Sequence, residues 1–148
     1  DMRSKMHDYI GGYVDPSEQV LYANFAILKT FVEREKVFEF LGLQIVNGKV
    51  TGRDTDVDPD IPYYQEIYDL YEWWTCTRNK ESLCLSELSS RVTYSMVETA
   101  DKDPTYGKLY QVEWKGPRKE HTDAQQAFDD RDDEMLLRLI KVRRQLWT

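Results

Sequence analysis

The sequence has little of what metal centres and nucleophilic enzymes require. It contains two cysteines, Cys76 and Cys84, and two histidines, His7 and His121. The cysteines lack the C-x-x-C spacing of a zinc site, and the histidines are too few for a second ligand pair or a catalytic triad. Two thiols without a disulfide framework suit a reducing compartment. We therefore predict no catalytic residue, no metal and no cofactor.

Phosphate-binding and targeting motifs are also missing. The chain has no GxxxxGK[ST], no GxGxxG after a strand and no GxSxG. No apolar run approaches the length of a membrane span, and no signal peptide is recognisable, so we expect no membrane partner. The chain begins with Asp1 rather than Met, so we expect that an N-terminal piece precedes it, whereas the C-terminus is expected to be natural.

Basic residues are in the minority. The chain has 20 Lys and Arg against 27 Asp and Glu, which gives a net charge of −7. Binding to duplex nucleic acid needs a basic face, because release of counterions from phosphates drives it. We therefore expect no duplex partner. An acidic surface is compatible with plain solvation, with a basic protein partner or with mimicry of nucleic acid.

Apolar and aromatic residues are plentiful enough for a core. They make up 41% and 13% of the 148 residues, a length that fits one domain. We predict an irregular arm over residues 1–14 and a single helical domain over 15–148. The fold class should be mainly α, with three long packed helices and one or two small β-hairpins.

Capping signals and apolar periodicity place these elements. Asp15-Pro16-Ser17-Glu18 predicts a helix start, and the helix should continue to about Leu41 with Gly42 as its stop. A second helix is expected over about 62–79 and a last one over 122–147. Asn47-Gly48 predicts a tight hairpin over 45–50, and alternation predicts a strand over 108–115. Residues 82–97 fit a helix, but 92–99 fit a strand equally well.

Four charged residues fall within otherwise apolar helix faces: Glu35 and Glu39 on the first helix, Arg78 on the second and Arg143 on the last. Buried charges must be paired, so a carboxylate–guanidinium network between the helices is expected. Three interpretations remain open. The network could set helix register, it could line a pocket for a small anionic ligand, or the side chains could simply reach solvent.

A cluster of aromatic residues marks the second helix. Tyr63, Tyr64, Tyr71 and Trp74 share its inner stripe, which favours a place in the core. Tyr68 and Trp73 project elsewhere on the helical wheel, and we predict that they contact a partner.

Carboxylates suggest one enzymatic alternative. Glu66-Ile67-Tyr68-Asp69 matches the second half of the Mg²⁺-binding pattern of all-α nucleoside triphosphate pyrophosphohydrolases, ExxE followed by ExxD. The first half fails, because Glu33, Glu35 and Glu39 do not give its spacing. The aspartates of residues 51–60 are also imperfect as a calcium loop, and a solvated loop is favoured there.

Three segments resemble an uncharacterised group of small tailed-bacteriophage proteins. They are residues 21–36, residues 66–74 and the terminal segment 133–148 with its Leu-Trp-Thr ending. The resemblance implies a viral origin, with the host bacterial cytoplasm or the virion as the setting. It implies no activity, ligand or catalytic residue.

The leading hypothesis is a non-enzymatic phage accessory protein that acts by binding, for example by inhibiting a host defence factor. Its partner would be a host or phage protein, or a small anionic ligand, and homo-oligomerisation stays open. A virion structural or assembly component is the second hypothesis, and it predicts an exposed apolar face with Trp73 or Trp147. The Mg²⁺-dependent hydrolase is the third.

Overall fold

The computed structural model describes residues 15–52 and 60–147, with no side-chain description for Gln145 and Trp147. The arm predicted over 1–14 and most of the aspartate-rich loop therefore lie outside the described residues. The chain divides into two compact units, one made of residues up to Arg78 and from Arg131 onward, the other of Asn79–Asp130. Both are built mainly from helices, with two small antiparallel two-stranded sheets, so the mainly α class is confirmed. Within the described ranges, no helix is both long and apolar enough to cross a membrane.

Helix α2, Pro16–Glu33, begins where the sequence predicts. The amide and the hydroxyl of Ser17 both donate to one carboxylate oxygen of Asp15, each at 2.9 Å. This pairing satisfies a helix-end amide that has no partner within the helix. The backbone hydrogen bond from Ser17 lowers the pKa of Asp15, because it favours the charged carboxylate.

The same helix ends earlier than predicted. The Thr30 carbonyl accepts hydrogen bonds from the amides of both Arg34 and Glu35, at 2.9 and 3.1 Å, which terminates regular α-helical pairing. Lys36 then adopts a left-handed conformation with φ of 52°, uncommon for a residue with a side chain. The prediction of one helix to Leu41 is therefore wrong.

The break redirects the chain into a short helix, α3, Val37–Phe40. Val37 and Phe38 of this short helix are buried in the core. Gly42, with φ of 69°, ends α3 as predicted, and the Leu43 amide bonds back to the Phe38 carbonyl at 2.8 Å.

The predicted Asn-Gly hairpin is present as β1, Gln44–Val46, and β2, Lys49–Thr51. Asn47 and Gly48 both have positive φ, 51° and 77°, as a type I′ turn requires. Gln65, from the helix that follows in the chain, holds the hairpin in place. Its side-chain carbonyl accepts from the Val50 amide at 2.8 Å, and its amide donates to the Gly48 carbonyl at 2.9 Å.

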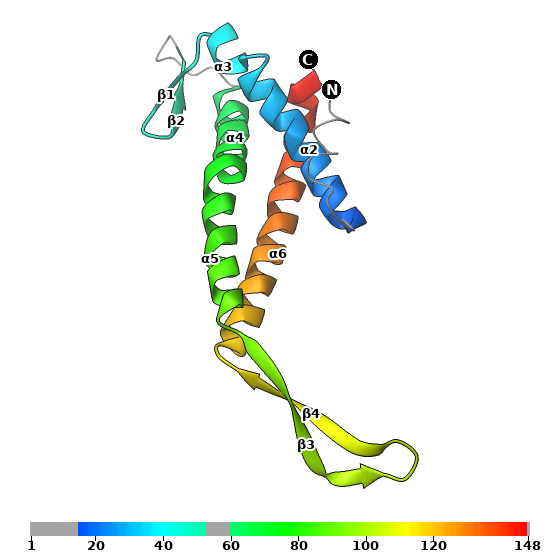
Figure 1. Cartoon of the computed structure of the whole chain (residues 1–148). Helices are drawn as coiled ribbons and strands as arrows, with labels where there is room; N and C mark the ends of the chain where they lie inside the picture. The colour runs from blue at the N-terminus through cyan, green and yellow to red at the C-terminus, as the bar shows by residue number, and fades with distance from the viewer. Residues whose placement is uncertain (1–14, 53–59, 148) are drawn as a thin grey trace. The chain divides into compact units, whose positions relative to one another are not determined.

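The second helical segment runs without interruption through α4, Ile61–Glu72, a π-helical turn η1, Trp73–Thr77, and α5, Arg78–Ser90 (Figure 1). Residues 82–90, in the region where both a helix and a strand fitted the sequence, are therefore helical. In the π turn, the Arg78 amide bonds to the Trp73 carbonyl five residues back. Because this turn widens the helix, Trp73 and its neighbour Trp74 both contact the Phe25 ring, with centroids 5.4 and 4.6 Å away.

The final helix, α6, Arg118–Val142, is followed by a 3₁₀ turn, η2, Arg143–Trp147. It begins four residues before the predicted Thr122, because the Pro117 carbonyl already accepts from the His121 amide at 2.9 Å. Met135, Leu139 and Val142 of α6 are buried in the core of the first unit, as their spacing predicts. The core there also includes the following side chains of α2, α4 and η1: Leu21, Phe25, Leu28, Phe31, Ile67, Leu70 and Trp73.

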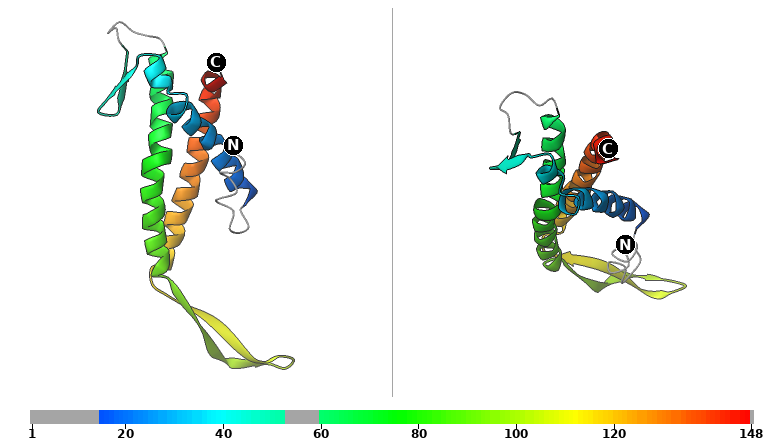
Figure 2. Two further views of the ribbon diagram at one scale, coloured as in Figure 1. Left: turned by 45° about the horizontal axis from the view of Figure 1, so that its top comes forward. Right: turned by 90° about the horizontal axis from the view of Figure 1, so that it is seen from above.

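In the second unit, strands β3, Thr93–Asp103, and β4, Gly107–Lys115, form one antiparallel pair, here called the ribbon. It twists along its length, as a two-stranded ribbon does (Figure 2). The strand predicted over 108–115 is confirmed. Gly116, with φ of 91°, follows β4, and a Cβ there would lie 2.1 Å from the Arg91 carbonyl oxygen, so only glycine fits this junction.

Candidate functional site

The predicted network of Glu35, Glu39, Arg78 and Arg143 does not form. Glu35, Glu39 and Arg143 are exposed, and the Glu39 carboxylate lies 3.9 Å from the Lys36 ammonium in a solvent-exposed ion pair. The early end of α2 explains the two glutamates, because the break removes them from the apolar arc. Of the three interpretations of these charged residues, the one in which the side chains reach solvent applies to Glu35, Glu39 and Arg143. Among the described residues, none of the three pairs with Arg78, whose ion-pair partner is Asp132.

Arg78 is buried, but its partner is a different residue. Its Nε and one terminal nitrogen donate to the two oxygens of Asp132 in α6, at 2.8 and 2.9 Å. Both side chains are largely shielded from water, with 9% and 14% exposure. This is the bidentate fork that arginine forms with a carboxylate, and it fixes the relative position of the two helices at this level.

Aromatic rings complete the surroundings of Arg78. Its guanidinium carbon lies 4.9 Å from the Trp74 ring and 5.5 Å from the Tyr22 ring. Burial alone would lower the pKa of Arg78, but the hydrogen bonds that Arg78 donates to Asp132 and Tyr22 outweigh it, so the pKa is raised and the side chain stays charged. For Arg78, the geometry fits the interpretation that a buried ion pair sets the register of the helices. The acidic partner is Asp132 rather than Glu35 or Glu39.

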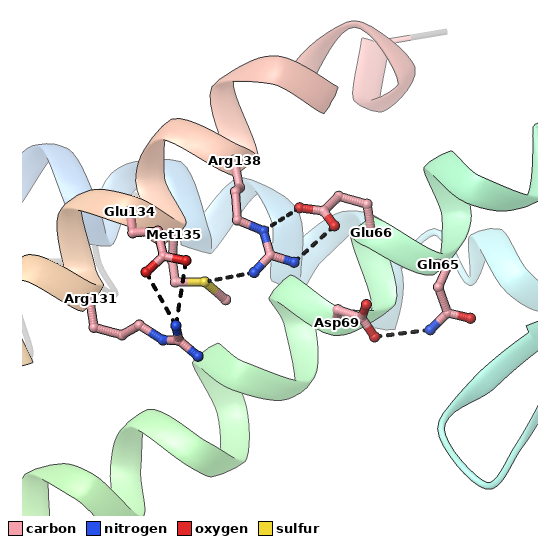
Figure 3. A network of polar contacts seen from close by, with 7 residues as sticks. All are labelled: Gln65, Glu66, Asp69, Arg131, Glu134, Met135 and Arg138. Carbon is pink, nitrogen blue, oxygen red and sulfur yellow. Dashed lines mark hydrogen bonds and ion pairs between the residues drawn. The ribbon is translucent and has the colours of Figure 1, made fainter.

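A second fork joins α4 and α6. Arg138 donates to both oxygens of Glu66, at 2.5 and 2.9 Å, and to the Met135 sulfur at 3.3 Å (Figure 3). The hydrogen bonds to Glu66 raise the pKa of Arg138. Asp69 accepts from Gln65 at 2.9 Å.

These contacts bear on the enzymatic alternative, since Glu66 and Asp69 are the residues of its half motif. Both carboxylates already accept hydrogen bonds from protein donors. Across residues 15–52 and 60–147, no group of three or more His, Cys, Asp or Glu could hold a metal ion. The hydrolase interpretation stays a prediction that the described geometry does not favour.

The two aromatic residues predicted to meet a partner lie elsewhere. Trp73 is 3% exposed and belongs to the core, with its buried ring N–H unpaired among the described residues. Tyr68 is half-buried and packs edge-on against Phe38, with ring centroids 6.2 Å apart. The prediction that Trp73 contacts a partner is wrong, because Trp73 lies one turn after the buried Leu70 and its ring packs against Phe25. Tyr63, predicted to be in the core, is exposed instead.

Tyr71 gives the first unit a titratable contact. Its hydroxyl donates to Glu33 at 2.8 Å, and burial together with this carboxylate raises the pKa of Tyr71 to about 12.

In the unfolded chain the pKa of this tyrosine is near 10. Between pH 10 and 12 the unfolded chain therefore holds fewer protons than the folded one, and the free energy of unfolding should fall as pH rises. Tyr71→Phe should remove this contribution. Urea unfolding at a series of pH values, with tyrosinate absorbance to follow the titration, measures how the free energy of unfolding changes with pH. If this change were the same in the variant and the wild type, the prediction would be contradicted.

Several exposed apolar side chains lie together on the ribbon. Cross-strand pairing sets Tyr94 opposite Trp114, Met96 opposite Val112 and Glu98 opposite Tyr110, and alternation places all three pairs on one side. The five apolar members, here called the ribbon face, are between 41% and 66% exposed: Tyr94, Met96, Tyr110, Val112 and Trp114. The other side is mostly polar, with Ser95 opposite Glu113 and Val97 opposite Gln111.

Charged groups border the ribbon face at both ends. The Arg118 guanidinium carbon lies 4.1 Å from the Trp114 ring centroid at the end next to α6. At the other end the Lys108 ammonium lies 3.8 Å from Glu98. An isolated two-stranded ribbon is only marginally stable in water, so a face of this composition is normally covered by something.

Sequence reasoning missed this surface, although a signal was present. The alternation of Tyr110, Val112 and Trp114 is clear, but residues 92–99 were left open between helix and strand, so no partner strand was assigned. Asp132 could also have been found, since it lies three residues before Met135 on the same apolar stripe.

Comparisons with known proteins add no relative. The chain matches no family model, no curated protein and no solved structure.

Proposed function

We propose that this chain is a non-enzymatic viral accessory protein that acts by binding another protein, and that the ribbon face is its contact surface. The observation that carries the proposal is the exposure of five large apolar side chains in register on one side of β3 and β4. Aromatic residues and methionine are enriched where proteins meet, and exposed contiguous apolar patches mark interaction sites. Inhibition of a host defence factor is one action that such binding would produce.

Charge favours a protein over a nucleic acid as the partner. The ribbon carries three lysines and four carboxylates: Lys102, Lys108, Lys115, Glu98, Asp101, Asp103 and Glu113. Single strands stack on aromatic residues, but their binding also needs a positive groove that follows the phosphates. A nearly balanced ribbon on a chain of net charge −7 lacks that groove.

Photocrosslinking at two adjacent positions tests the proposal. Met96 and Val97 are neighbours in β3 but lie on opposite sides of the ribbon, so they form a matched pair. With a photoreactive amino acid at position 96, we expect a discrete protein adduct in host cells. The same label at position 97 should give several-fold less. Equal yields from both positions, or no adduct from either, would contradict the assignment of the contact surface.

A virion or assembly component is the second candidate, and the ribbon face favours it specifically. That hypothesis predicts an exposed apolar face, here formed around Trp114 rather than around the buried Trp73. It also requires a stoichiometric place in the particle. Mass spectrometry of purified particles separates it from an accessory protein, which should be absent or present only in traces.

A further inference from the structure

We infer that the occupant of the ribbon face is a second copy of this chain, packed face to face about a twofold axis. The inference rests on the proposed function and names its partner. In a twofold interface, a residue that contacts a second residue across the axis is contacted by that same residue in return. The surface must therefore be complementary to itself, and the ribbon face has this property.

The register of the ribbon shows the symmetry. The Met96–Val112 pair lies in the middle, with Tyr94–Trp114 two residues to one side and Glu98–Tyr110 two residues to the other. When a second ribbon is laid antiparallel on this face with the middle pairs in contact, the Tyr94–Trp114 end of one copy meets the Glu98–Tyr110 end of the other. Tyr110 then packs against Trp114 in both halves, a pairing that aromatic rings favour.

Charge complementarity follows from the same arrangement. Arg118 lies over Trp114 at one end of the face, and Glu98 lies at the other end beside Lys108, half exposed. The twofold operation brings Glu98 of each copy to Arg118 of its partner. Each copy thus supplies one carboxylate to the partner's Arg118, and Lys108 of the same copy lies 3.8 Å from that carboxylate.

The area is sufficient for a weak dimer. With exposures of 41–66%, the five side chains present on the order of 600 Å² of surface per copy. Two such faces together reach about 1,200 Å², the lower end of the range for specific interfaces. We therefore expect a dissociation constant on the order of micromolar.

Sedimentation velocity of the full chain across a concentration series around the micromolar range tests the inference. The wild type should pass from monomer to dimer. Val112→Asp places a charge in the middle of the face and should weaken association at least about tenfold. Val97→Asp, a similar change on the opposite side of the ribbon, should leave the dissociation constant unchanged. Circular dichroism establishes that both variants keep the helical content of the wild type.

A charge exchange tests the twofold register. Glu98→Arg and Arg118→Glu should each weaken the dimer, and the double variant should recover most of the loss, because the exchanged pair forms again across the axis. A wild type that stays monomeric throughout the series overturns the inference, and so does a dimer that survives Val112→Asp. If the chain is monomeric but Met96 still crosslinks to a different protein, only the identity of the partner fails. Absence of both dimer and adduct removes the proposed function as well.

Discussion

Phe25→Ala is expected to lower the free energy of unfolding by about 3–5 kcal/mol. Phe25 has no exposed surface, stacks on the Trp74 ring at 4.6 Å and lies 5.4 Å from the Trp73 ring. Its removal takes away a ring that both indoles contact and opens a cavity that the remaining rigid rings cannot close. Urea unfolding followed by tryptophan fluorescence measures the loss.

Two further variants keep this test informative. Phe25→Leu retains most of the volume and should cost less, about 1–1.5 kcal/mol. Phe40→Ala removes the same side chain from a position that is 85% exposed, so its effect should stay within about 0.5 kcal/mol. Similar losses for Phe25→Ala and Phe40→Ala would show that the core is not organised around the ring cluster described above.

Arg78→Leu is expected to cost about 3–5 kcal/mol, because it leaves the Asp132 carboxylate buried without its partner. The double variant Arg78→Leu with Asp132→Leu should regain most of this loss. A buried ion pair repays its own desolvation only in part, and apolar replacements avoid that cost. Thermal or urea unfolding of the two single variants and the double variant gives the coupling free energy directly.

Arg143→Leu is the matched control, since it makes the same substitution at the position where Arg143 is exposed. It should change the free energy of unfolding by no more than about 0.5 kcal/mol. If Arg143→Leu lowered the free energy of unfolding as much as Arg78→Leu, Arg143 would have to be part of a buried charge network after all. A double variant no more stable than the single variants would instead show that Arg78 and Asp132 act independently.

Local chemistry made the helix starts and tight turns predictable. Asp15 and the Asn47-Gly48 pair act through their own backbone neighbours, so their structures follow from a few residues. The end of α2 did not follow in this way. Nothing between Thr30 and Lys36 is a strong helix breaker, and the left-handed Lys36 is held because Val37 and Phe38 gain burial in the core. Such tertiary packing is not visible in a local pattern.

The candidate site was predictable only in part, for a related reason. Trp73 was placed off the inner stripe of the helical wheel, but α2 packs widely enough against this helix that Phe25 contacts both Trp73 and Trp74. The choice of Glu35 and Glu39 as partners for Arg78 failed once α2 proved to be interrupted. On the ribbon, pairing of β3 with β4 joins residues about twenty positions apart, and neither strand alone reveals that their apolar side chains share one face.

The π turn has a consequence for how this helix tolerates length changes. It amounts to one inserted residue, and it shifts the angular phase of every residue after it by roughly 100° relative to a regular α-helix. Trp73 before the insertion meets Phe25, and Arg78 after it meets Asp132, so the two contacts require different phases of the same helix. Deleting a single residue such as the exposed Cys76 would restore regular geometry, yet it would force the chain to give up one contact or the other.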